Sequence, residues 1–205
     1  MKKQNSVQSY VSLSLNFFQH DTITIAKSLI GIILVHESKE GVTAGRIVET
    51  EAYLSNNDPA CHAARGKNKK NEAMFDKAGT GYVYLIYGTN YCFNVVTEKA
   101  GVGEAVLIRA LEPIKGIELM QKRRSPKEKM KELTNGPGKL CQAMGITKEH
   151  DKADLLSPPL YLAADSFHEV QTKDITTSTR IGISKGKDKL LRFYMTGNYY
   201  VSRLS

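Results

Sequence analysis

Two acidic residues stand inside a run of the chain that otherwise has the composition of a buried strand. Residues 46–53 read Arg-Ile-Val-Glu-Thr-Glu-Ala-Tyr, with carboxylates at Glu49 and Glu51. A carboxylate in an apolar strand is costly unless it is paired or used in chemistry. Strand alternation predicts that Ile47 and Tyr53 share one face with the two acids. Such a face suits a general base beside a flat, stacked ligand.

Ion pairing is the alternative explanation for these acids. Either acid could pair with Arg46, or with a lysine at a sheet edge, and have no catalytic role. Arg109 lies in the middle of a second apolar run, residues 105–111, and a buried arginine needs an acceptor such as Glu49 or Glu51. That pair is either purely structural or a device in which Arg109 helps to hold a water molecule against the carboxylate. Both alternatives are open from the residues alone.

An aromatic β-hairpin is predicted from residues 82–96. The runs 82–87 and 91–96 are rich in tyrosine and β-branched residues, and Gly-Thr-Asn at 88–90 separates them, which is typical of a hairpin. Aromatic pairs stabilise hairpins without any further function. Tyr87 differs because it precedes the turn, and an aromatic at an exposed hairpin tip of a basic protein could wedge between DNA bases.

A possible phosphate site is predicted at Gly136-Pro137-Gly138-Lys139, which leads into a short helix ending at Met144. Backbone N–H groups of Gly138 at the helix start, together with the amine of Lys139, could bind a phosphate. The spacing is not that of a Walker loop, and an ordinary capped turn explains the motif equally well. The histidines at 20, 36, 150 and 168 fit no metal-ligand spacing, so we expect neither a metal nor a cofactor.

The bulk composition predicts one globular domain spanning residues 1–205, with residues 1–15 loosely ordered. The net charge of +8 and the pI near 9.3 favour a polyanionic partner, most often nucleic acid, although solubility alone is an alternative. The basic residues concentrate at 65–70 and 122–127. No apolar run approaches the roughly 20 residues of a membrane helix, and no secretory h-region or CxxC pair occurs. We therefore expect a cytoplasmic protein without membrane association.

The order of predicted elements indicates an α+β fold. We expect a single mixed domain with a curved, largely antiparallel sheet flanked by helices and a protruding β-hairpin. The helices are predicted at 22–29 with Asp21 as N-cap, from Pro113 to about Arg124, and up to Met144 with Gly145 as the stop. Outside the hairpin, the strands are predicted at 32–36, 42–53, 104–111, 179–183, 191–196 and 199–203.

Four segments together match a known family. Arg-Ile-Val-Glu-Thr-Glu-Ala-Tyr at 46–53, Tyr-Val-Tyr-Leu-Ile-Tyr-Gly at 82–88, Leu-Ile-Arg-Ala-Leu-Glu-Pro at 107–113 and Gly-Pro-Gly-Lys-Leu-Cys-Gln-Ala at 136–143 occur in this order. The chain resembles the alkyladenine (3-methyladenine) DNA glycosylase family of the animal-enzyme type, in a short, bacterial-like form. The resemblance runs from about residue 21 to the C-terminal segments, nearly the whole chain.

The resemblance implies a base-excision repair enzyme. Such an enzyme flips alkylated or deaminated purines out of double-stranded DNA and hydrolyses the N-glycosidic bond, leaving an abasic site without a Schiff-base lyase step. Glu51 matches the general base and Arg109 the arginine that positions the water. Tyr87 matches the intercalating residue, and Glu49 is left as structural support. The residues that match the base pocket are Tyr53, His62, Tyr84 and Asn94, with the asparagine at its floor disfavouring the exocyclic amine of normal guanine.

Two features depart from the family's pattern, and two other functions compete with it. The hairpin tip at 88–90 is more polar than expected, and Gly138 stands where some relatives have serine. A non-catalytic module that binds lesions or RNA would need neither Glu51 nor Arg109. A hydrolase of free nucleosides would need neither the basic loops nor Tyr87. We expect a monomer acting on duplex DNA, associated with the nucleoid if the source is bacterial.

Overall fold

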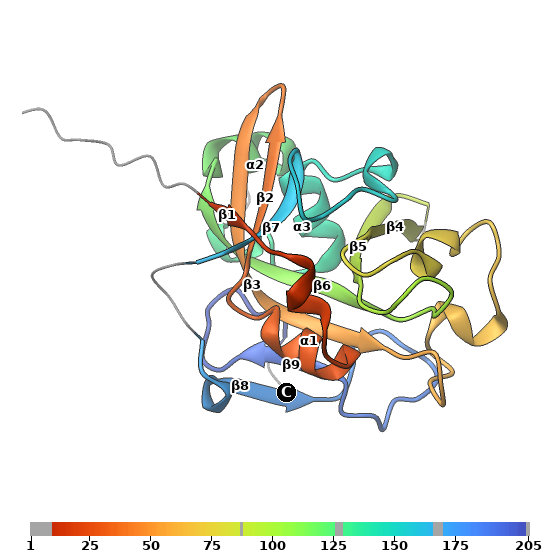
Figure 1. The fold of residues 1–205 in the computed structure, drawn as a ribbon. Helices are drawn as coiled ribbons and strands as arrows, with labels where there is room; N and C mark the ends of the chain where they lie inside the picture. The colour runs from red at the N-terminus through yellow and green to blue at the C-terminus, as the bar shows by residue number, and fades with distance from the viewer. Residues whose placement is uncertain (1–9, 87, 126–128, 166–169, 204–205) are drawn as a thin grey trace, which may run out of the picture.

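A single curled antiparallel sheet forms the centre of the protein in the computed structural model, which describes residues 10–86, 88–125, 129–165 and 170–203 (Figure 1). Within these residues the order of strands is β1-β7-β2-β3-β6-β5-β4, while β9 pairs with β3 and β8 with β9. The strands are β1 Val11–Ser12, β2 Ile33–Ser38, β3 Gly41–Tyr53, β4 Gly81–Ile86, β5 Asn90–Val96, β6 Ala105–Lys115, β7 Leu160–Ala164, β8 Ile175–Ser178 and β9 Arg192–Met195. The α-helices are α1 Thr22–Ser28, α2 Ile117–Arg124 and α3 Pro137–Met144. The predicted single α+β domain is confirmed.

Strand β3 is the axis on which the other elements assemble. It spans 13 residues and pairs with β2, β6 and β9, so it is enclosed on both sides. Three register shifts interrupt its ladder with β6, between Ala44 and Gly45, between Ile47 and Glu49, and between Glu49 and Thr50. The second leaves Val48 as an extra residue on β3, and the third leaves Arg109 as an extra residue on β6. The unbroken alternation predicted from Ile47 onward is therefore wrong, because a bulge changes the phase of the side chains that follow it.

Helix α1 packs against β3 and begins where the sequence predicts. Both Ile23 and Thr24 donate their backbone N–H groups to Oδ1 of Asp21 at 3.0 Å, which satisfies two of the donors that a helix start leaves free. Ile25 and Ala26 of this helix are buried in the main apolar core. The carbonyl of Ala26 accepts the hydroxyl of Thr50 at 2.9 Å, so the helix is bonded directly to the strand that holds both acids.

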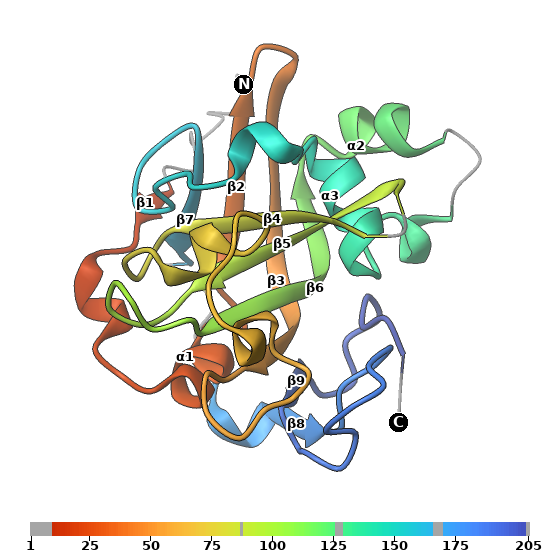
Figure 2. The same cartoon turned by 90° about the vertical axis from the view of Figure 1, so that its right-hand side faces the viewer.

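The hairpin β4–β5 is confirmed. Its register pairs Gly81 with Val95 and Ile86 with Asn90, and Figure 2 shows it crossing in front of the upright β2–β3 pair toward α3. Helix α3 ends at Met144, and Gly145 caps it, as predicted, in a left-handed conformation with φ of +73°. Tyr87 lies outside the described residues.

The predicted helix start at Pro113 is wrong. Strand β6 continues to Lys115 and α2 begins at Ile117. Pro113 is tolerated inside the strand because the ladder shifts register beside it, and prolines occur in sheets at such irregularities. The turn into α2 is made by Gly116 with φ of +72°, a conformation that other residues adopt only with strain.

The late strands are partly wrong. The strand predicted at 191–196 is confirmed as β9, but neither 179–183 nor 199–203 forms a strand. The preceding segment, Ile175–Ser178, is β8 instead. Strands β1 and β7 were not predicted from the sequence. Strand β1 has only two residues, too few to show an alternation of polar and apolar side chains. Strand β7 is buried at four consecutive positions and so lacks that alternation as well. No helix in the described ranges is long and apolar enough to cross a membrane.

Replacing Gly116 with alanine should destabilise the protein more than replacing Gly197, whose φ is nearly the same. A left-handed alanine costs about 1–2 kcal/mol at either position. At Gly116 the new Cβ would also lie 2.3 Å from the carbonyl oxygen of Val42, whereas at Gly197 nothing lies within 4 Å. Urea unfolding of the two variants measures the difference in the free energy of unfolding. Equal losses would contradict the packing argument.

Candidate active site

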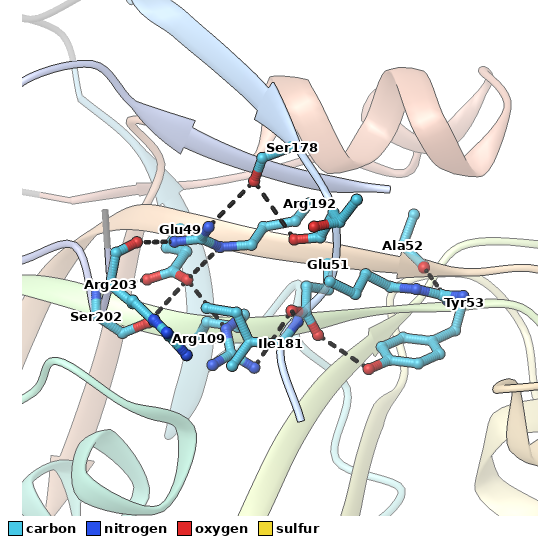
Figure 3. A network of polar contacts seen from close by, with 12 residues as sticks. Glu49, Glu51, Ala52, Tyr53, Arg109, Ser178, Ile181, Arg192, Ser202 and Arg203 are labelled. Atoms are coloured by element: carbon cyan, nitrogen blue, oxygen red, sulfur yellow. Dashed lines mark hydrogen bonds and ion pairs between the residues drawn. The ribbon is translucent and has the colours of Figure 1, made fainter. Parts of the chain in front are cut away.

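Glu49 is the acceptor for two arginines from different strands (Figure 3). Its Oε1 accepts Nε of Arg109 at 3.0 Å and Nε of Arg192 at 2.8 Å. Ser202 donates its hydroxyl to Oε1 at 2.9 Å and its backbone N–H to Oε2 at 2.7 Å. The side chain of Glu49 has no exposed surface. The C-terminal segment thus completes the set of donors around this buried carboxylate.

Glu51 has a different set of partners, although it is only two residues away and equally buried. Its Oε1 accepts the backbone N–H of Ile181 at 2.7 Å, and its Oε2 accepts the hydroxyl of Tyr53 at 2.9 Å. Nη1 of Arg109 lies 3.4 Å from Oε1, which is an ion pair rather than a short hydrogen bond. Burial raises the pKa of Glu51, and the charge of Arg109 offsets only part of that effect. A carboxylate in this state is a stronger base than an exposed one.

Arg109 joins the two acids, as the sequence predicts. Burial acts to lower its pKa, but the adjacent carboxylates of Glu51 and Glu49 outweigh burial and leave the pKa raised. The alternative pairing with Arg46 is wrong. Nη1 of Arg46 binds Asp165 at 2.6 Å and its Nε lies 3.6 Å from Glu112, because β3 carries it toward the other end of the sheet.

Beside Glu51 lies a small aromatic cavity. Its empty volume, which includes space open to solvent, is about 240 Å³. The residues that line it are Tyr53, Ala60, His62, Met74, Tyr82, Tyr84 and Asn94. All four predicted pocket residues are therefore brought together. Glu51 is not in the lining, and the hydroxyl of Tyr53 connects it to the cavity.

The rings of the cavity hold one another in place. The rings of His62 and Tyr84 lie edge to face with centroids 4.6 Å apart, and those of Tyr82 and Tyr84 are 5.4 Å apart. Nδ1 of His62 lies 2.8 Å from the hydroxyl of Tyr82, and burial lowers the pKa of His62, which favours the neutral ring. Asn94 donates its side-chain amide to the carbonyl of Tyr82 at 3.0 Å, which fixes its orientation.

Several residues of this site were missed from the sequence. Tyr82 is one of them, and strand alternation, which puts it on the same face as Tyr84, is the signal that could have assigned it to the pocket. Arg192, Ile181 and Ser202 belong to a C-terminal stretch without a recognisable motif. Nothing local in the sequence indicates that they contact an acid about 130–150 positions earlier.

The predicted phosphate motif packs against the tip of the hairpin. A Cβ at Gly138 would lie 3.0 Å from Cβ of Asn90, so the glycine permits close approach of α3 to β5. Nζ of Lys139 donates to Asn135 at 3.1 Å. A groove with an empty volume of about 1,040 Å³ opens here between the hairpin tip and the helices α2 and α3. The phosphate role of Gly138 and Lys139 stays a prediction.

The cysteines at 61, 92 and 141 are free and buried. Within the parts of the chain that the structure describes, no three His, Cys, Asp or Glu side chains are grouped so as to hold a metal ion.

Comparison with known proteins identifies the family of this chain. The sequence model of the family described as methylpurine-DNA glycosylase (MPG) matches residues 16–199. A relative from Methanoculleus marisnigri, named "Putative 3-methyladenine DNA glycosylase", is 50% identical over 94% of this chain and 100% of its own. Relatives of the same name from Carboxydothermus hydrogenoformans and Francisella tularensis are 47% and 49% identical, over 93% and 89% of this chain and 98% and 94% of their own. The chain belongs to the methylpurine-DNA glycosylase family.

Membership of the methylpurine-DNA glycosylase family confirms the predicted resemblance. The protein is a DNA glycosylase of base excision repair, an enzyme that hydrolyses N-glycosyl bonds. This class agrees with the predicted enzyme and argues against a module that only binds nucleic acid.

Substituting Glu49 with glutamine should strongly destabilise this glycosylase. The change leaves Arg109 and Arg192 buried without their carboxylate, and breaking a buried pair in this way costs about 3–5 kcal/mol. The matched control is Glu112→Gln, which removes a 38% exposed acid 3.6 Å from Arg46 and should cost about 1 kcal/mol or less. Urea unfolding of both variants compares the losses. A similar small loss in both would show that the Glu49 network contributes little to stability.

Proposed function

We propose that this glycosylase flips an alkylated or deaminated purine out of duplex DNA into the aromatic cavity and hydrolyses the N-glycosidic bond with a water activated by Glu51. The observation that carries the proposal is the connection of a buried carboxylate of raised pKa, through Tyr53, to a cavity lined by flat rings. A base held against those rings presents its glycosidic bond toward the acid. The product is an abasic site.

The cavity supports binding of a flipped base by stacking. Extruding a nucleotide costs a few kcal/mol, and less when damage weakens the pair. Stacking on aromatic side chains returns about 1–3 kcal/mol per contact, and Tyr53, His62 and Tyr84 provide the surfaces. Alkylated purines carry positive charge and are attracted to aromatic faces as cation–π partners. The lowered pKa of His62 supports this role, because a neutral imidazole does not repel a cationic base.

Glu51 is suited to act as the general base. Cleavage of a glycosidic bond passes through an oxocarbenium-like state, which a nearby carboxylate stabilises by its charge. The raised pKa of Glu51 increases its ability to accept a proton from water, and the donors Tyr53, Ile181 and Arg109 favour the ionised form that does so. Arg109 contributes a second donor to position that water. Glu49 orients Arg109 by binding its Nε.

The substrate class follows from the pocket and from the relatives. The relatives' names specify 3-methyladenine, and we propose alkylated and deaminated purines as the substrates here. Asn94 at the cavity wall would disfavour the exocyclic amine of normal guanine. No lysine lines the cavity among the described residues. Since a Schiff-base lyase step needs such an amine, we propose a monofunctional enzyme.

The partner in this proposal is double-stranded DNA containing a damaged purine, bound by a monomer. The net charge of +8 supports attraction to the phosphate backbone. Gly138 and Lys139 stand beside the hairpin tip, where a phosphate of the flipped strand could meet them. Tyr87 is proposed to fill the space left by the flipped nucleotide.

The variant Glu51→Gln should bind lesion DNA normally but release the base about 10²–10⁴-fold more slowly, because it lacks the general base. Single-lesion duplexes, each carrying one alkylated or deaminated purine, are scored by alkali-sensitive strand cleavage, with binding measured in parallel. Glu72→Gln removes a half-exposed acid paired with Lys152 and is the matched control with wild-type rate. Free nucleosides, tested beside the duplexes, should not be cleaved. Wild-type release by Glu51→Gln would refute the assignment of the base.

The variant Tyr87→Ser should weaken binding to lesion duplex by about 1–3 kcal/mol, the stacking that an aromatic side chain provides to a base. Binding to a single-stranded oligonucleotide with the same lesion should change less, because no base stack has to be filled. Titration of both DNA forms by fluorescence anisotropy measures the difference. Unchanged affinity for the duplex would rule out the wedge role.

A further inference from the structure

Arg180 lies directly behind the wall of the cavity and is buried. Its Nη1 and Nη2 each donate to Asp58 at 2.6 Å, in a pair whose two side chains have no exposed surface. Nη1 also donates to the carbonyl of Ala52 at 2.9 Å. The guanidinium carbon stands 4.6 Å from the ring centroid of Tyr53. The planar side chain of Arg180 therefore contacts strand β3 at Ala52, the ring of Tyr53 and, through Asp58, the loop that follows the strand.

Asp58 connects Arg180 to a residue on another wall of the cavity. It accepts the backbone N–H groups of Leu54 at 3.1 Å and Ala60 at 3.3 Å. Ala60 lines the cavity, and Leu54 directly follows Tyr53. The loop between the two walls is thus bonded through one carboxylate to Arg180.

On the other side, Arg180 is bonded to the chain segment that holds the acid. The residue after it, Ile181, donates its N–H to Glu51 at 2.7 Å. Figure 3 shows Ile181 and Tyr53 on either side of Glu51, with Ala52 adjoining the ring. A shift of Arg180 would move the ring of Tyr53 and the N–H of Ile181 together, and these are two of the three donors to Glu51.

Stability alone does not account for this arrangement. A fully buried ion pair is often no more stabilising than apolar side chains of the same volume. Moreover, Nε of Arg180 is buried and finds no hydrogen-bond partner among the described residues, which is itself unfavourable. A lysine could not replace the fork that meets both oxygens of Asp58 and the flat face that stacks on Tyr53. The geometry therefore requires an arginine, because only its side chain can fix the positions of Asp58 and Tyr53 at the same time.

We propose that Arg180 is a positioning residue that sets the aromatic wall and the catalytic carboxylate in one fixed relation, by binding Asp58 and Ala52 and stacking on Tyr53. The inference rests on the proposed function of Glu51 and the cavity. Arg180 does not touch the reacting atoms. Its effect reaches them through Tyr53 and through the N–H of Ile181.

The test compares Arg180→Met and Arg180→Lys with the wild type. Lesion-duplex affinity should change only a few-fold, because Arg180 is buried behind the cavity wall. The single-turnover rate constant of base release should fall about 10²-fold in Arg180→Met, as expected for misplaced catalytic groups. Arg180→Lys should fail to restore the rate. The acidic limb of the rate profile should move to higher pH. Losing a nearby positive charge and a fixed N–H donor raises the pKa of Glu51, so a higher pH is needed to ionise it.

The controls separate positioning from stability. Arg46→Met removes a partly buried arginine of strand β3 that is bound to Asp165, and it should leave the rate per folded enzyme and its pH profile unchanged. If Arg180→Met does not fold, the rate and pH profile of Arg180→Lys decide the question, since this variant keeps a positive charge opposite Asp58. A wild-type rate per active enzyme with an unshifted acidic limb would overturn the inference. Glu51→Gln, measured in the same series, distinguishes failure of the proposed function from failure of the positioning role. A fully active Glu51→Gln variant refutes the proposed function. An inactive Glu51→Gln variant together with a normal Arg180 variant refutes only the positioning role of Arg180.

Discussion

The fold depends on neutralising two carboxylates that β3 carries into the interior. Each of Glu49 and Glu51 is fully buried, and a buried charge without a partner costs several kcal/mol. Two arginines balance them, Arg109 from β6 and Arg192 from β9. These strands therefore have to lie on opposite sides of β3, and the C-terminal Ser202 has to return to the same point. The topology around β3 follows from this requirement.

The register shifts on β3 and β6 make the sharing of one arginine possible. Arg109 is the extra residue of β6 at this point, and a bulge redirects the side chain that it carries. Its Nε reaches Glu49 while its Nη1 faces Glu51. Glu49 then has two arginines and a serine, whereas Glu51 has a phenol, a backbone amide and a longer ion pair. Two acids two positions apart thus acquire different properties from their surroundings alone, which is how paired carboxylates take separate roles.

The sequence predicted those parts of the molecule in which local chemistry decides the outcome. The cap of α1 at Asp21, the hairpin and the burial of two acids on one strand all depend on neighbouring residues. The helix at Pro113 was wrong because propensity suggested a start, while pairing with β3 extended the strand. Arg180 and Arg192 were missed because their partners lie 122 and 143 positions away. Long-range ion pairs and bulges leave no period in the sequence, so only the assembled sheet shows them.

The presence of a second acid has a consequence for the proposed reaction. A single arginine beside the general base would oppose the positive charge that develops on the sugar, and burial would strengthen that opposition because the local dielectric is low. Glu49 is bonded to the same arginine and cancels most of its charge. Arg192, which balances Glu49, is turned away toward Ser178 and the carbonyl of Arg203. Arg109 therefore divides its attraction between the two acids and offsets only part of the charge of Glu51. The burial that makes this network costly is therefore also what makes the field of Glu51 strong, so stability and catalytic strength have a common physical origin.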